Sequence, residues 1–170
     1  MKKTLYILFI IFTFAILQSC INPFAPTLDD SNNTSDIIGD QKTVEGLFKN
    51  FRYAYVFKDT LVYGNLLADD FTFVYWNYDQ GTNRTWGREE DMRSTAGLFQ
   101  AAQNLDLIWN EVVLSIGDSL IKDISRGFIL NIVFSPSDVV RLQGRVNLRI
   151  KRNSVDDEWK ISIWRDESNY

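Results

Sequence analysis

The residues best suited to binding a small molecule are aromatic. Tyr55, Tyr75, Trp76, Trp109 and Trp164 come from segments spread along the chain. If folding gathers them, they could line a pocket for an apolar or ring-bearing ligand, with the tyrosine hydroxyls fixing its orientation. An aromatic-rich sheet packed on helices also needs such residues in its core, and core packing is the favoured interpretation of the set.

A second candidate is the carboxylate Glu111, which interrupts the apolar residues Trp109 and Val112 to Leu114. If it points inward, Glu111 is the best candidate for a carboxyl with a shifted pKa. A β-bulge that turns it outward would explain it equally well. The adjacent acids Asp69 and Asp70 could share a proton, but neighbours on an extended chain point to opposite sides, so a turn after a helix is favoured.

The residue inventory excludes several kinds of site. The chain has no histidine and only one cysteine, Cys20. A Ser-His-Asp triad, a Cys-His pair and imidazole metal sites therefore cannot form, and an intramolecular disulfide cannot form either. Catalysis would have to use carboxylate, Tyr, Lys, Arg, Ser or Thr groups, and we expect no cofactor and no metal.

Charge argues against nucleic acid as a partner. The formal net charge of the 170 residues is -4. Removal of residues 1–19 would take away Lys2 and Lys3 and leave 16 basic and 22 acidic residues, a net charge of -6. Such a domain repels a phosphate backbone.

The N-terminus has the three parts of an export signal. Lys2 and Lys3 precede an apolar run from Leu5 to Leu17, and the small residue Ser19 precedes Cys20. The run is shorter than the ~20 apolar residues that span a bilayer comfortably. The sequence Leu17-Gln18-Ser19-Cys20 resembles the lipobox of bacterial lipoproteins, although Gln18 is bulkier than the usual residue. This resemblance implies a signal peptide over residues 1–19 and lipid on Cys20.

The lipid would attach the protein to a membrane of the cell envelope, since two or more acyl chains anchor stably. Ile21 follows Cys20, whereas an Asp there would resemble an inner-membrane retention signal, so the outer membrane is favoured. Residues 20–40 carry two of the three prolines and a polar run from Asp29 to Asp36. They are predicted to be a flexible tether.

Residues 41–170 are predicted to be one domain. Apolar residues at steps of three and four predict helices over 42–57 and 59–68, and three acids in a first turn open a third over 88–103. Alternating polar and apolar residues predict four strands, over 105–116, 125–134, 139–151 and 158–166. A β-branched and aromatic run predicts a further strand over 71–78 that is covered on both faces. Residues 84–87 are expected to pair back with that strand. This order indicates an α+β fold, with a lipocalin-type barrel as the alternative.

Several short motifs in this order resemble the nuclear-transport-factor-2-like superfamily, which includes SnoaL-like and ketosteroid-isomerase-like domains. They are Lys58-Asp59, Leu67-Ala68-Asp69-Asp70-Phe71, Trp86-Gly87-Arg88-Glu89 and Trp159-Lys160-Ile161-Ser162-Ile163-Trp164. The resemblance covers residues 41–166. It implies a cone in which three N-terminal helices pack on a curved, mainly antiparallel sheet and close a pocket.

The resemblance also allows a test of one activity. By alignment, the catalytic Tyr, Asp base and buried Asp of ketosteroid isomerases fall at Phe51, Tyr75 and Val146, so none of those groups is present. Tyr75 would be a poor base, with an unperturbed pKa of about 10. The predicted pocket-lining residues are Phe51, Tyr55, Tyr75, Trp109, Glu111, Val146 and Trp164.

Three functions remain open at this point, because one fold hosts many functions. A non-catalytic module that binds a small apolar ligand or a protein is favoured. A cyclase-, isomerase- or hydrolase-like enzyme using Glu111, Tyr75 and Tyr55 is the first alternative. A structural homodimer that associates through its sheet is the second.

Overall fold

The computed structural model describes residues 37–166, so the leader, Cys20 and most of the predicted tether lie outside the described residues. Its elements are α2 (Val44–Val56), α3 (Thr60–Leu66), β1 (Leu67–Asn77), β2 (Thr82–Gly87), α4 (Arg88–Ala101), β3 (Asn104–Gly117), β4 (Ile121–Ser135), β5 (Asp138–Lys151) and β6 (Lys160–Asp166). The predicted α+β order is confirmed.

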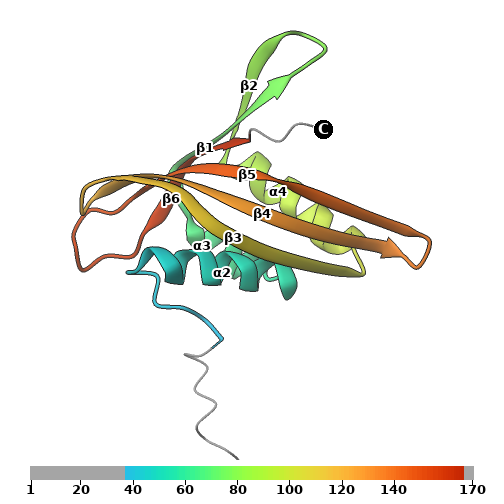
Figure 1. Ribbon diagram of the computed structural model, residues 1–170, viewed down its shortest axis with the longest axis horizontal. Helices are drawn as coiled ribbons and strands as arrows, with labels where there is room; N and C mark the ends of the chain where they lie inside the picture. Colours follow the sequence, from blue (N-terminus) through green and yellow to red (C-terminus); the bar gives the residue numbers. More distant parts are fainter. Residues whose placement is uncertain (1–36, 167–170) are drawn as a thin grey trace, which may run out of the picture. The chain divides into compact units, whose positions relative to one another are not determined.

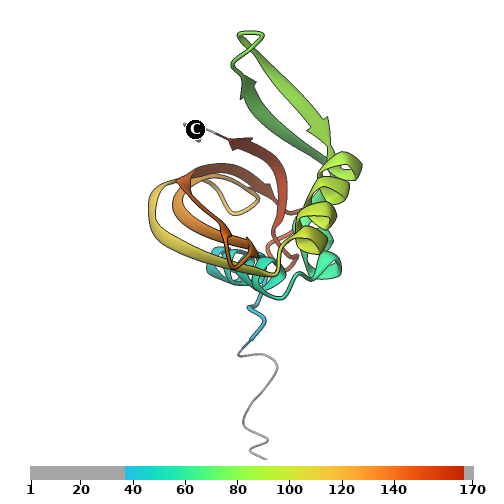
Figure 2. The same ribbon diagram turned by 90° about the vertical axis from the view of Figure 1, so that its right-hand side faces the viewer.

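The six strands form one open sheet in the order β2-β1-β6-β5-β4-β3. Only the β1–β6 pair is parallel, and the other neighbours are antiparallel. The long strands β3 to β5 curl over the helices, and the end of the β1–β2 hairpin extends beyond the rest of the domain (Figures 1 and 2). Because the sheet does not close on itself, the barrel alternative is wrong.

Side-chain caps set the start of the first two helices. The Thr43 side chain accepts a hydrogen bond from the Gly46 amide at the start of α2, and Asp59 accepts from the amides of Leu61 and Val62 at the start of α3. Such caps satisfy amides that have no partner inside the helix. Lys58, between the two helices, has a φ of 56°, which turns the chain sharply from α2 into α3.

The packed domain begins slightly before the predicted boundary at Gln41. The Gly39 amide donates to Asn50 Oδ1 at 2.6 Å, and the Asp40 carbonyl accepts from the Thr43 amide at 3.0 Å. Buried Gln41 donates to the Trp159 carbonyl at 2.9 Å. Residues 39 and 40 are therefore hydrogen-bonded to the packed domain.

One strand differs from its prediction. β1 starts at Leu67, because Leu67 pairs with Ile161 of β6 where a helix end was expected. Phe71 and Phe73 are buried, but Trp76 is 46% exposed. The prediction that this strand is covered on both faces is therefore wrong for its outer half, which lies in the extending hairpin (Figure 1).

A single core joins the helices to the concave face of the sheet. Alternation on β5 is as predicted, with Val146, Leu148 and Ile150 buried and Arg141, Arg145 and Arg149 exposed. Phe48 and Phe51 of α2 and Tyr63 of α3 are buried in the same cluster. The core is therefore continuous with the wall of the cavity described next.

Candidate ligand-binding cavity

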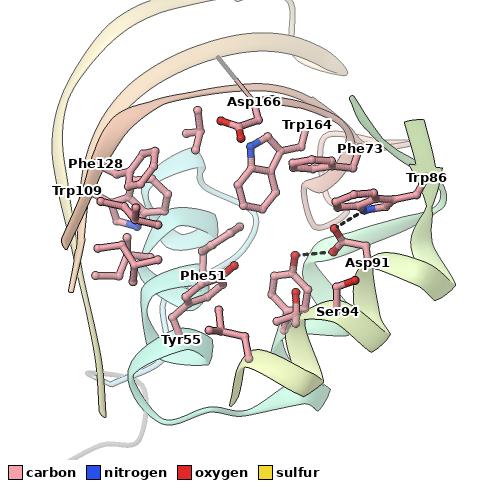
Figure 3. A pocket seen from close by; sticks show the side chains of 17 residues that line it. Phe51, Tyr55, Phe73, Trp86, Asp91, Ser94, Trp109, Phe128, Trp164 and Asp166 are labelled. Carbon is pink, nitrogen blue, oxygen red and sulfur yellow. Dashed lines mark hydrogen bonds between the residues drawn. The ribbon is translucent and has the colours of Figure 1, made fainter. Parts of the chain in front are cut away.

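A cavity of about 230 Å³ lies between the helices and the concave face of the sheet (Figure 3). Eight of its 17 lining residues are aromatic: Phe51, Tyr55, Tyr63, Phe73, Trp86, Trp109, Phe128 and Trp164. Five aliphatic side chains complete the apolar wall, and the polar lining residues are Asp91, Ser94, Thr95 and Asp166. The cavity is thus apolar over most of its surface, with a few polar groups in defined places, as in small-molecule sites.

Five of the seven residues predicted to line a pocket lie in this wall. They are Phe51, Tyr55, Trp109, Val146 and Trp164. Phe51 contacts Trp109 and Trp164 with ring centroids 5.4 Å apart in each case. The Trp109 Nε1 donates to the Phe48 carbonyl at 2.9 Å, which fixes the indole against α2.

A bulge in β6 decides the direction of Trp164, for which strand alternation gives the wrong face. Arg149 pairs with Ile163, but the next residue, Ile150, pairs with Ile161, so Ser162 is an extra residue. Ile161, which is buried, and Trp164 therefore both face inward although they are three residues apart. The Ser162 hydroxyl donates to the Arg149 carbonyl at 3.1 Å.

Two predicted residues do not line the cavity. Tyr75 packs behind the wall, against Phe73 and Trp86. Glu111 is exposed and lies beside Gly127 and Gly144 on another part of the sheet. The β3–β4 register shifts on both sides of Val112, so the outward β-bulge is the correct explanation and the inward Glu111 is wrong.

The buried acid that does line the cavity is Asp91 of α4, one of the three acids that were expected only to suit the helix dipole. Its side chain is buried, with a residue exposure of 4%. Its Oδ2 accepts from the Tyr63 hydroxyl at 2.6 Å and its Oδ1 accepts from Trp86 Nε1 at 3.0 Å (Figure 3). Burial raises the pKa of the Asp91 carboxyl, and these two hydrogen bonds partly offset the rise.

A sequence signal for Asp91 was available. Asp91, Thr95 and Phe99 are the buried residues of α4, and they recur every four residues. Glu89 and Glu90 lie off this stripe and are exposed. The four-residue spacing therefore separates one acid from its two neighbours.

Two tyrosines stand beside Asp91. Burial, together with the negative charge of Asp91, raises the pKa of Tyr55 and that of Tyr63. Both therefore remain neutral hydroxyls near pH 7. The Tyr63 hydroxyl is committed to Asp91, and the two tyrosine rings lie 5.9 Å apart.

Trp164 Nε1 is buried at the cavity and has no hydrogen-bond partner among residues 37–166. Asp70 pairs with Lys151 at the surface at 2.5 Å, away from the cavity. Within residues 37–166, no group of three or more Cys, Asp or Glu side chains is arranged to hold a metal ion. None of the helices in that range has the length and apolar character needed to cross a bilayer.

No protein-family model matches the chain, and no curated protein matches it. Solved structures are similar in fold. A putative scytalone dehydratase from Novosphingobium aromaticivorans superposes with a TM-score of 0.64 at 12% identity, over 75% of this chain and 82% of that one. The β subunit of a putative aromatic-ring-hydroxylating dioxygenase from the same organism gives 0.61 at 9% identity, over 76% and 89%.

A third structure, described as Rd1NTF2_04 with long sheet, gives a TM-score of 0.52 at 13% identity, over 72% of this chain and 98% of that one. Identities this low show a shared fold and do not transfer an activity. The curved sheet, its helices and these neighbours together establish that the described domain has the nuclear-transport-factor-2-like fold.

Proposed function

We propose that this protein is a lipid-anchored component of the cell envelope whose domain binds a small, apolar, ring-bearing molecule. The observation that carries the proposal is the 230 Å³ cavity with eight aromatic residues in its wall. An apolar cavity of about 150 Å³ can hold benzene, so this one has room for a single ring with a small substituent. The two Novosphingobium neighbours have names that denote enzymes or enzyme subunits, which is consistent with an occupied pocket.

The cavity is tested by filling it. Val146→Phe places a larger side chain in the wall, whereas Val139→Phe makes the same change at an exposed site on the same strand. We expect one-ring compounds such as toluene and benzyl alcohol to bind the natural protein and the Val139 variant in ligand-observed NMR. Binding should be lost in the Val146 variant, and equal binding by all three proteins would refute a site in this cavity.

Membrane attachment is a separate part of the proposal and rests on Cys20 and the leader. Cells fed an alkyne-tagged fatty acid should label the natural protein and not the Cys20→Ser variant. The control restores a thiol elsewhere in the tether by adding Ser31→Cys to Cys20→Ser. Labelling of that control would show acylation without position specificity, and an unmodified Cys20 in membrane-extracted protein would contradict the lipoprotein interpretation.

One observation favours an enzyme as the second candidate: a buried acid, Asp91, hydrogen-bonded to Tyr63 inside the cavity. A carboxyl with a raised pKa can serve as a general acid or base, and Asp91 replaces Glu111 in that role. The test is to incubate a bound compound with the natural protein and with Asp91→Asn and to analyse it by mass spectrometry. Turnover by the natural protein alone supports the enzyme, and unchanged compound supports the binding module.

A further inference from the structure

Building on the proposed ligand-binding function, we infer that the cavity selects a positively charged ligand: a small organic amine or quaternary ammonium ion that carries an apolar ring. Two independent features meet at one place: a wall of aromatic rings and a buried carboxylate that has no cationic partner in the described part of the chain. Neither the fold nor its neighbours specify the charge of a ligand, so the argument depends on this chain's own residues.

The first feature is the uncompensated acid. Asp91 receives hydrogen bonds from two neutral groups, the Tyr63 hydroxyl and Trp86 Nε1. The ion pairs found among residues 37–166 do not include Asp91. Arg88, one turn earlier on α4, donates its Nη2 to the Gly64 carbonyl at 2.9 Å instead. A buried carboxylate without a counter-charge is costly, and a ligand cation would supply that charge.

The second feature is the aromatic wall next to that acid. Trp86, which donates to Asp91, stacks on Phe73 with centroids 4.5 Å apart and planes 10° apart. Phe73 in turn contacts Trp164, and Trp164 contacts Phe51. Ring faces attract organic cations, most strongly when water is excluded. The acid therefore lies at one end of a continuous series of rings.

The charged residues among the rest of the cavity lining also favour a cationic ligand over an anionic one. A second carboxyl residue, Asp166, belongs to the wall, whereas none of the described residues in the wall is Lys or Arg. An anionic ligand would meet the Asp91 carboxyl and no basic side chain among the described residues of the wall. A neutral ligand would leave the Asp91 carboxylate without a counter-charge.

The titration of Asp91 points the same way. Its pKa is raised because burial disfavours the charged carboxylate. The groups around it are Tyr63 from α3, Trp86 from β2 and, through its negative charge, Tyr55 from α2. A cation beside the carboxylate would lower that pKa again.

The test compares three probes of matched shape with the purified protein in lipid nanodiscs, with empty nanodiscs as the blank. The probes are benzyltrimethylammonium, its neutral carbon isostere neopentylbenzene, and the anion benzylsulfonate. Fluorescence of Trp86, Trp109 and Trp164, which line the cavity, reports binding. We expect the cation to bind about tenfold more tightly than the isostere, and the anion not to bind.

The outcomes separate the two proposals. If neopentylbenzene binds as tightly as the cation, the charge inference is wrong and the ligand-binding function stands. If none of the three probes binds, the charge inference is wrong, and the ligand-binding function is decided by the separate experiment with toluene and benzyl alcohol. If the anion binds most tightly, the inference is overturned because the wall then attracts the opposite charge.

A pair of variants locates the effect. Asp91→Asn should lower the affinity for benzyltrimethylammonium about tenfold and change that for neopentylbenzene less than threefold. Glu90→Gln removes the same charge from the exposed neighbouring residue and should leave both affinities as they are. An equal loss in both variants would overturn the role of Asp91. If circular dichroism shows that Asp91→Asn is unfolded, the affinity ratio in the natural protein decides.

Discussion

At the residue scale, Asp91 is the side chain on which most of the site depends. It connects three elements, because its own helix α4 is joined through its carboxyl to Tyr63 of α3 and Trp86 of β2. Trp86 and Tyr63 are also cavity-lining residues. The same carboxyl therefore holds two walls of the cavity in place and provides its buried charge.

Removing this acceptor should destabilise the domain. Asp91→Ala leaves the buried Tyr63 hydroxyl and the part-buried Trp86 Nε1 without their acceptor, and such a loss costs about 1–3 kcal/mol for a fully buried donor. We expect the free energy of unfolding to fall by about 2–4 kcal/mol in urea denaturation. Glu90→Ala, at the exposed neighbouring position, should change it by less than about 0.5 kcal/mol. Equal effects of the two changes would contradict the role given to Asp91.

The shifted carboxyls predict opposite responses to acid. Asp91 has a raised pKa in the folded state, so it binds its proton more tightly there than in the unfolded chain. The contribution of Asp91 to the free energy of unfolding is present below the pKa that Asp91 has in the unfolded chain, and it is lost as pH rises through its pKa in the folded protein. The Asp123 pKa is lowered by its hydrogen bond with Arg149, so its contribution is present above the unfolded pKa and is lost as pH falls.

Urea denaturation at pH 7 and at about pH 4 measures both signs. On acidification, the natural protein should gain stability relative to Asp91→Asn and lose stability relative to Asp123→Asn. The two variants remove the same formal charge, so each is a control for the other. The same direction of change in both comparisons would contradict the assigned shifts.

At the element scale, helix α2 is held to the start of the domain by a close backbone approach. A Cβ added to Gly46 would lie 1.8 Å from the Asp40 carbonyl oxygen. Thr43, which caps α2 by accepting from the Gly46 amide, also donates its hydroxyl to that same carbonyl at 2.8 Å. The glycine therefore allows the first turn to dock while Phe48 and Phe51 point toward the core.

Two helix glycines should respond oppositely to the same substitution. Gly46→Ala forces the first turn away from Asp40, and we expect it to lower the free energy of unfolding by about 2 kcal/mol or more. Gly97→Ala, in α4, meets no atom within 4 Å and should raise it by roughly 0.5–1 kcal/mol, because alanine favours helix over glycine. Thermal unfolding followed by circular dichroism checks both. A stable Gly46 variant would contradict the close approach.

At the scale of the whole described domain, helices α2 to α4 pack on the concave face of the sheet (Figure 2). The edge strand β3 exposes apolar side chains on the described domain, with Val113 59% exposed and Ile116 58% exposed. Open edges with apolar side chains invite pairing with another chain. A homodimer that associates through the sheet therefore remains a prediction, and the exposed edge strand β3 is the surface at which to test it.

Light scattering of the purified protein tests that prediction. The homodimer hypothesis predicts twice the chain mass, and Val113→Lys should return the protein to a monomer. Leu61→Lys changes an equally apolar side chain that is 80% exposed on α3, and it should leave the dimer intact. If light scattering gives the mass of a single chain for the natural protein, the homodimer hypothesis is wrong.

Element types and the α+β order followed from sequence periodicity, because helix and strand periods reflect which side chains are buried. The strands over 105–116 and 139–151 correspond to β3 and β5 within one residue at each end. The predicted boundary between helix and strand was wrong where pairing between distant segments sets it. Leu67 belongs to β1 and not to a helix, because it pairs with Ile161 of β6. Two β-bulges decide which way the Trp164 and Glu111 side chains point. The bulges depend on the register between neighbouring strands, which local sequence patterns do not predict.

By itself, the sequence determined the residue inventory, the predicted leader and tether, the kinds of element and five of the residues in the cavity wall. Local periodicity and composition are enough for these, because they depend on neighbours along the chain. Only the tertiary structure decided that Asp91, and not Glu111, is the buried acid of the cavity. That choice depends on two side chains 28 residues apart, Tyr63 and Asp91, whose buried hydrogen bond forms only when α3 and α4 pack together.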